Sequence, residues 1–480
     1  MAPYRGFDER ALAERLITAL PASAAAALRW GSTDLRASAE HLLYTRLVRP
    51  PATATARFIA ARSIGRILRS AFGAAPASPR PRGSILVLIT QPIHGRLFRP
   101  VGEILDSRGM PWLMLDAETR EGRSAGTAAR LADYRVLPHV ASLIAHATAV
   151  ATHLAHPVAE WEGLVVEARA RELSVTLTRG LPLVALEAAR LRVAIQRHAP
   201  ALVVCFSESG MLARVAPAAS RPLGIPVVDL PHAEAADPSG TVGAGYQGVA
   251  VYGPRAAAAM ALAGIDPARV VEIGPLGKDA LQRAARDPDD GPRRVVFASQ
   301  PMDASRPNLH PDVIRTALAS AVASAEQLAP AQLIVIRHPT QSLGEVEGLL
   351  RDVRLPEGLA AHVERDRTLH EILPGAWLMV TASSQSVFDA LLSGVPAMVV
   401  TPTGSDPTGF GADGIAIAVG SAEEATTWAS ELRNPDRRTE AVGRARQALG
   451  SRIGPLDGRA AERAADWLIA MSRPDPAPRP

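Results

Sequence analysis

Short apolar runs that end in polar loops, each followed by a helical segment, constrain the fold of this chain more than any other feature. The clearest examples are VIRHPT at 335–340 and TASSQSVFDALLSGVPAMVV at 381–400. Each run has the length and character of a buried strand, and the segment after it has helical spacing. Strands that alternate with helices in this way predict an α/β protein with parallel sheets.

The same alternation occurs in two halves, and 480 residues are too many for one ordinary core. The polar segment RDPDDGPRR at 286–294 separates the halves, as a domain boundary would. Strands are predicted at 84–90, 111–116, 201–207, 225–232 and 248–253, and then at 295–300, 333–339, 359–365, 377–384, 396–402 and 414–420. We therefore predict two Rossmann-like domains facing a central cleft. The expected parts are a helical extension (1–80), an N-terminal domain (81–285), a C-terminal domain (286–472) and a disordered tail (473–480).

Composition argues against several classes of function. The net charge is only +4 and the basic residues are dispersed, so nucleic acid is not an expected partner. The single cysteine, Cys205, excludes an internal disulfide and a multi-cysteine metal site. No histidine or carboxylate cluster has metal-ligand spacing, so no metal is expected. The chain also lacks a Walker A sequence and a GxGxxG after a strand, which argues against an ATPase or a dehydrogenase.

The sequence predicts a cytoplasmic protein, because no secretory signal or membrane-spanning apolar run is visible. The segment ATARFIAARSIGRILRSAF at 54–72 is basic and amphipathic. It fits a helix packed on the next domain, and it also fits a helix lying on a membrane. Peripheral contact with the inner face of the membrane through the N-terminal helices therefore stays open.

Polar residues gather where the predicted strands of the second half end, and parallel sheets bind ligands beyond these ends. The imidazole of His338 can donate a hydrogen bond to an anion, and a helix that begins after the serines would offer free N–H groups. We expect the His338 loop and the serine loop to hold one anion between them. The structural alternatives are an ordinary loop histidine, a helix-capping serine and a solvated carboxylate. The candidate binding residues are Ser299, Gln300, Arg337, His338, Ser383, Ser384, Ser386 and Asp389.

Candidate proton acceptors follow the strands of the first half. Glu208 and His232 rank first and His94 next, ahead of Asp116, Glu118 and Glu234. Glu208 lies where a helix is expected to begin, so a purely structural role as a stabilised anion is its main alternative.

Four segments together resemble a known family. They are IPVVDLPH at 225–232, VYGPRAAAAMALAGIDPARVVEIGPLGKD at 251–279, IRHPTQ at 336–341 and the serine-rich segment at 381–400. Their order and spacing resemble glycosyltransferases of the GT-B fold, in particular the bacterial capsule-polysaccharide group. That group includes polysialyltransferase-like and Kdo-transferase-like enzymes and related glycerophosphotransferases. The chain departs from the pattern at His232–Ala233, where the family commonly has His-Gly, and residues 1–80 have no counterpart.

The resemblance implies an inverting, metal-independent glycosyltransferase that moves a sugar from a nucleotide-sugar donor to a glycan or other hydroxyl acceptor. No cofactor is implied beyond the donor itself, and a CMP- or UDP-type donor is expected. The binding residues of the second half would hold the donor, and the catalytic base would be Glu208, His232 or His94. Three alternatives stay open: a CDP-alditol polyol-phosphate transferase, a nucleotide-sugar 2-epimerase and a non-catalytic nucleotide-sugar-binding scaffold.

Overall fold

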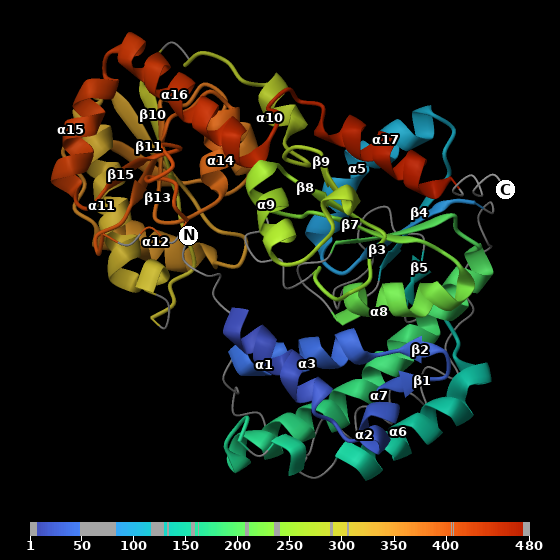
Figure 1. Ribbon diagram of the computed structural model, residues 1–480. Helices are drawn as coiled ribbons and strands as arrows, with labels where there is room; N and C mark the ends of the chain where they lie inside the picture. The colour runs from blue at the N-terminus through green and yellow to red at the C-terminus, as the bar shows by residue number, and fades with distance from the viewer. Residues whose placement is uncertain are drawn as a thin grey trace. The chain divides into compact units, whose positions relative to one another are not determined.

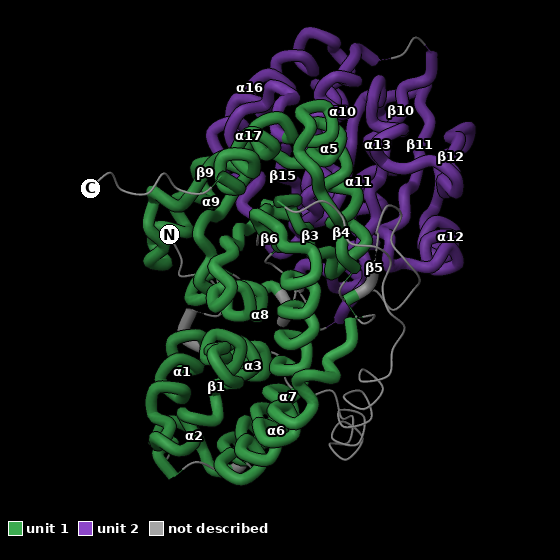
Figure 2. Tube along the Cα trace, turned by 90° about the vertical axis from the view of Figure 1, so that its right-hand side faces the viewer, with its two compact units in different colours: residues 1–277, 461–480 green, residues 278–460 purple. Residues whose placement is uncertain are grey.

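The computed structural model describes residues 7–48, 83–116, 129–131, 134–154, 159–161, 163–206, 211–234, 241–288, 291–304, 307–404, 406 and 408–473. The chain forms two compact units (Figure 2). Unit 1 comprises residues 1–277 and 461–480, and unit 2 comprises residues 278–460. Unit 2 thus begins at Lys278 rather than at 286. The last helix, α17 (Ala460–Ser472), packs on unit 1, where Arg463 donates a 2.8 Å hydrogen bond to the carbonyl of Ile273.

The sheet of unit 1 has seven strands within the described residues, and every strand is parallel to its neighbours. Their spatial order is β5-β4-β3-β6-β7-β8-β9, so β3, the first strand along the chain, is central. The chain adds β4 and β5 on one side of β3 and then β6 to β9 on the other, so the order of strand addition reverses between β3 and β6. This is the Rossmann order, and the reversal creates a topological switch point. The strands are β3 (Ile85–Ile89), β4 (Trp112–Asp116), β5 (Ala129–Arg130), β6 (Leu202–Phe206), β7 (Val227–Leu230), β8 (Gly248–Val251) and β9 (Val270–Glu272).

A layer of helices extends the core of unit 1 (Figure 1). The N-terminal helices pack on one another and on α7, and α6 packs on α7 from another side. Leu16 and Leu43 are fully buried in one cluster with Leu177, so residues 7–48 of the predicted helical extension belong to the core of unit 1. The helices are α1 (Phe7–Thr18), α2 (Ala22–Ala26), α3 (Arg36–Val48), α5 (Pro92–Ser107), α6 (Val140–Leu154), α7 (Glu167–His198), α8 (Met211–Ser220) and α9 (Pro254–Leu262). The small hairpin β1 (Arg29–Trp30) and β2 (Thr33–Asp34) joins α2 to α3.

The extension also fixes a loop of the Rossmann-like part. Arg10 of α1 and Arg214 of α8 both donate to the carbonyl of Val242, at 2.6 Å and 3.1 Å. Val242 lies in the glycine-rich segment that leads into β8. Two cations on one carbonyl hold this segment against the helices.

The sheet of unit 2 repeats the Rossmann order, with six parallel strands in the described part arranged β12-β11-β10-β13-β14-β15. The order in which the chain adds strands to the sheet reverses between β10 and β13, which is the switch point of this unit. The strands are β10 (Arg293–Ala298), β11 (Ala331–Ile336), β12 (Ala360–Val363), β13 (Leu378–Thr381), β14 (Ala397–Val400) and β15 (Ile417–Val419). The helices are α10 (Asp279–Arg283), α11 (Pro311–Gln327), α12 (Leu343–Asp352), α13 (Leu369–Ile372), α14 (Ser386–Leu392), α15 (Ala422–Leu432) and α16 (Pro435–Ile453).

The predicted architecture of two Rossmann-like parallel-sheet domains is confirmed, and each predicted strand listed above is present within a few residues of its expected position. The amphipathic segment 54–72 and most of the C-terminal tail lie outside the described residues. None of the described helices is long and apolar enough to cross a membrane.

A buried arginine fastens α16 to the strand and helix that flank the unit 2 switch point. Arg438 donates to the carbonyls of Trp377, Ala376 and Gly394, at 3.0, 2.9 and 3.0 Å. These carbonyls immediately precede β13 and follow α14. Burial lowers the pKa of Arg438 to about 10, so the side chain is still charged at neutral pH.

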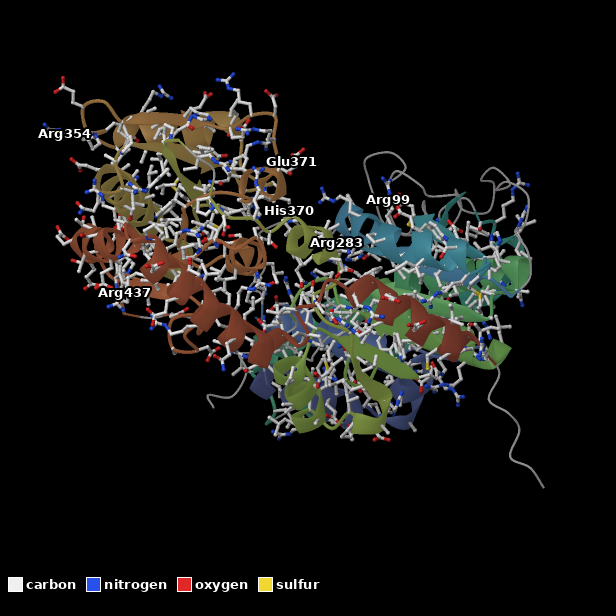
Figure 3. All side chains as sticks on the ribbon, turned by 90° about the horizontal axis from the view of Figure 1, so that it is seen from above. Arg99, Arg283, Arg354, His370, Glu371 and Arg437 are labelled. Carbon is white, nitrogen blue, oxygen red and sulfur yellow. The ribbon has the colours of Figure 1, made fainter. Side chains whose placement is uncertain are left out.

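We predict that Arg438→Met lowers the free energy of unfolding by about 3 kcal/mol, because buried carbonyls lose their donors. Urea denaturation followed by circular dichroism measures the change. The matched control is Arg437→Met on the same helix, where the arginine is 69% exposed (Figure 3). This control should stay within about 0.5 kcal/mol of the wild type. Equal effects of the two substitutions would contradict the fastening role.

Candidate functional site

Three neighbouring strands of unit 2 end level with one another. Ala298 pairs with Ile336 across β10 and β11, and Phe297 pairs with Val380 across β10 and β13. The N–H of Ser299 continues this pairing and donates to the carbonyl of Ile336 at 2.9 Å. The loops after β10, β11 and β13 therefore leave the same edge of the sheet. They carry all the candidate binding residues except Ser386 and Asp389, which lie on α14.

Hydrogen bonds join the β10 and β13 loops across the switch point. The N–H of Ser383 donates to Oε1 of Gln300 at 2.7 Å, and the amide of Asn308 donates to Oγ of Ser383 at 2.9 Å. Gln300 therefore holds the serine loop in place. Oγ of Ser384 accepts the N–H of Ser386 at 3.2 Å, a local bond just before α14, whose N-cap residue is Gln385.

Two hydroxyls at this edge are buried without a hydrogen-bond partner in the described part of the chain. They belong to Ser299, directly after β10, and Ser386, the first residue of α14. Buried hydroxyls are normally satisfied by protein or water. Polar groups that can receive a further partner thus lie on both sides of the switch point.

His338 is held as a neutral hydrogen-bond donor. The N–H of Thr340 donates to Nδ1 of His338 at 3.2 Å, and the Thr340 hydroxyl lies 2.8 Å from the same atom. Burial lowers the pKa of His338 below its ordinary value. Because Nδ1 accepts, the ring proton of the neutral form resides on Nε2. The backbone N–H of His338 is fixed by Oε1 of Gln341 at 3.0 Å.

The histidine and serine loops are separated by β10. Neighbouring strands lie about 4.8 Å apart, so β11 and β13 are about 10 Å from each other. The sequence-based expectation placed both loops around a single phosphoryl group. This spacing matches a longer anion, such as a diphosphate, better than it matches one phosphoryl group.

Asp389 lies in a cluster of charges that the sequence did not predict. Its carboxylate is 2.5 Å from Nζ of Lys278 and 3.3 Å from Nε2 of His370, which lies on α13 (Figure 3). Burial by itself raises the pKa of Asp389, but Lys278 and His370 outweigh it and hold that pKa below the ordinary value. The carboxylate expected to meet a sugar hydroxyl is therefore already paired twice within unit 2.

The candidate proton acceptors of unit 1 lie around the β3–β6 switch point. The buried ring of His94 on α5 stacks on Phe206 at 4.6 Å and lies 5.4 Å from the ring of His232, centroid to centroid. Glu208 and Glu118 lie outside the described residues. Burial, and next the nearby His232, lower the pKa of His94 to about 3. A group with so low a pKa is a poor proton acceptor at neutral pH, whereas His232 is only half buried.

Sequence reasoning missed Lys278, His370, Asn308 and Gln341. Lys278 and Asp389 are far apart in the sequence, and no local spacing indicates that they pair. Gln341 was the one residue with a signal, since it ends the IRHPTQ segment directly after the histidine loop.

Comparisons with known proteins show the fold. No family model matches the chain, and no curated protein sequence matches it. The structure resembles UDP-GlcNAc 2-epimerase from Neisseria meningitidis bound to UDP-GlcNAc, with a TM-score of 0.52 and 11% identity over 81% of this chain and 100% of that one. It also resembles MnaA from S. aureus in its structure with UDP, with a TM-score of 0.50 and 12% identity over 81% and 97%. MurG from Acinetobacter baumannii gives a TM-score of 0.47 and 15% identity over 81% and 100%.

We predict that Lys278→Met lowers the free energy of unfolding by about 1–3 kcal/mol, because it leaves a buried carboxylate with one partner. This loss of stability is smaller than for a fully buried ion pair, because the Lys278 side chain is 21% exposed. The depressed pKa of Asp389 contributes stability above its unfolded value of 3.8, and this contribution is lost as the pH falls. Asp389→Asn should lower the free energy of unfolding by at least about 1 kcal/mol less in the Lys278→Met background than in the wild type. Additive urea-denaturation results at pH 7 would show that the pair is not coupled.

A second prediction concerns His94 and acid. Its folded pKa lies far below the unfolded value of 6.5, so the unfolded chain binds a proton that the folded chain excludes. Stability should fall by about 1.4 kcal/mol per pH unit from this group as the pH drops below 6.5. His94→Gln should remove this part of the slope between pH 6.5 and 5. Urea denaturation across this range tests it, and an unchanged slope in the variant would contradict the assignment.

Proposed function

We propose that the chain is a glycosyltransferase that binds a nucleotide-sugar donor at the carboxyl edge of the unit 2 sheet. The observation that carries the proposal is the switch point between β10 and β13, bridged by the Gln300–Ser383 hydrogen bond. Ligands of open α/β sheets bind at such points. Its two buried hydroxyls and the His338 imidazole supply the donors that a diphosphate needs.

His338 would stabilise the leaving phosphate through its Nε2–H. A neutral donor aimed at developing charge is effective where water is excluded. Arg337 would add the positive charge, and its Nη1 is already oriented by a 3.1 Å hydrogen bond to the carbonyl of Gln341. Ser384 would contribute its hydroxyl proton, since its oxygen accepts the N–H of Ser386.

The nature of the donor and of the base remain predictions from the sequence. A UDP-type donor is supported by the likeness to a 2-epimerase bound to UDP-GlcNAc and to MnaA with UDP, while a CMP-type donor rests on the motif resemblance alone. Of the two described histidines among the candidate bases, we favour His232 over His94, because the pKa of His94 is about 3.

A second candidate function is nucleotide-sugar 2-epimerisation. The likeness to the Neisseria epimerase, which covers 81% of this chain, favours it. An epimerase inverts C2 of the donor sugar without an acceptor and exchanges the C2 hydrogen with solvent. A transferase releases the nucleotide only when an acceptor hydroxyl takes the sugar.

We predict that one nucleotide of a CMP, CDP, UDP and GDP-sugar panel binds below about 1 mM by calorimetry, which corresponds to about −4 kcal/mol. Binding by none of them would overturn the donor site. Incubation of the bound donor in D₂O then separates the two functions. Deuterium at C2 without an acceptor identifies the epimerase, and acceptor-dependent release of the nucleotide identifies the transferase.

His338→Ala should lower turnover by roughly 10²–10³ through the loss of one phosphate donor. His338→Gln should keep more activity, because its amide N–H can replace the Nε2–H. His153→Ala, on the exposed last turn of α6 in unit 1, is the matched control and should be unchanged. A wild-type rate for His338→Ala would remove this histidine from the site.

A further inference from the structure

A pocket of about 720 Å³ lies at the outer edge of the unit 2 sheet. We call it the side pocket. It is lined by the second half of α12, by Val353 and Leu355 after this helix, by the edge strand β12 and by Arg365 after this strand. Figure 3 labels Arg354 in the connecting segment. β12 is two strands away from β10, so the side pocket is separate from the switch point of this unit.

One part of the side pocket is apolar. Leu350, Val353, Leu355 and Val363 line it. Leu350, Val353 and Val363 are partly buried against the core of unit 2, so this lining continues the core outward. Leu355 is 37% exposed, so part of this apolar lining is open to solvent.

The other part is cationic. Arg351 donates its Nε–H to the carbonyl of Glu347 at 3.3 Å, and in the described part of the chain no carboxylate forms an ion pair with its guanidinium. Arg365 is held in place by Glu347, whose carboxylate lies 2.5 Å from its Nη2. Two guanidinium groups and one carboxylate thus leave the side pocket with a positive charge.

A histidine completes the polar side. The amide of Gln332 donates to Nδ1 of His362 at 3.3 Å, which leaves the ring proton of the neutral imidazole on Nε2. His362 lines the side pocket beside Val363. His362 therefore adds one N–H group to the polar lining of the side pocket.

We propose that the side pocket binds a small soluble amphiphile that joins one phosphate or carboxylate group to a compact apolar body. The guanidinium groups of Arg351 and Arg365 receive the oxyanion, for which their planar donor geometry is suited. The apolar body packs on Leu350, Val353, Leu355 and Val363. The volume is within the range of small-molecule sites. This ligand is additional to the proposed donor, so the inference does not depend on the proposed function.

The test is a titration of the full-length protein, labelled with ¹³C at the leucine and valine methyl groups, with phenyl phosphate. The methyl signals of Leu350, Leu355 and Val363 should shift with a Kd below about 1 mM. Inorganic phosphate and phenol, each carrying one half of the chemistry, should bind at least about tenfold more weakly. The proposal is overturned if these methyl signals do not shift when the phenyl phosphate concentration is about tenfold above the expected Kd. It is also overturned if inorganic phosphate binds as tightly as phenyl phosphate.

Variants separate the two halves of the side pocket. Arg351→Met and Leu355→Ser should each weaken phenyl phosphate by about tenfold. Arg437→Met, an exposed arginine elsewhere on unit 2, should leave the affinity unchanged (Figure 3). Unchanged affinity in both Arg351→Met and Leu355→Ser overturns the proposal.

Two other occupants give distinct outcomes. If a second copy of the chain covered the side pocket, the same methyl signals would shift with protein concentration alone, and Leu355→Ser would abolish that shift. If a membrane covered the side pocket, the wild type would co-sediment with vesicles of anionic phospholipid, whereas the Arg351→Met variant would not. Either result replaces the small amphiphile and overturns the proposal.

Discussion

Parallel pairing of every described strand in the two large sheets is the constraint on which the rest of this molecule depends. In a parallel sheet all strands end at the same edge, so polar loops that are distant in the sequence become neighbours without any direct pairing between them. In unit 2 this brings Gln300 and Ser383 to within one hydrogen bond, although 83 positions separate them in the chain. In unit 1 it brings His94 to His232 in the same way.

Residues behind each loop then hold it in one conformation. Arg438 binds carbonyls that precede β13 and follow α14. Asn308 and Gln300 hold Ser383 by hydrogen bonds, and Gln341 accepts the backbone N–H of His338. These four side chains act on the backbone and the loops, and Gln300 is at the same time one of the candidate binding residues. A site that must stabilise charge benefits from such support, because donors that are already oriented need not reorganise during the reaction.

The pattern of apolar runs predicted the longer strands of both large sheets, which are short, nearly continuous buried runs, as in β3 and β13. It missed β5, which has two residues, and β9, which is not fully buried. It also located the loops, because polar residues follow each run directly. The pairing of Asp389 with Lys278 and His370 was beyond reach, because an ion pair between distant segments leaves no local period. The low pKa of His94 depends on its burial and next on the nearby His232, which a sequence does not record. The position of α17 in unit 1 depends on contacts such as that between Arg463 and Ile273.

The electrostatics of the unit 2 loops favour hydrogen bonds over full charges. Within the described parts of the loops after β10, β11 and β13, the arginine that can meet a ligand is Arg337. The nearby Lys278 is paired with Asp389. His338 is neutral, since burial and the Thr340 N–H both oppose a second proton on its ring. An anion bound here would be held mainly by oriented N–H and O–H dipoles. Such dipoles retain their strength at short range and low dielectric, where a solvated charge would be screened. The arrangement therefore favours a ligand whose anionic group is enclosed by the loops over one that is held at the surface.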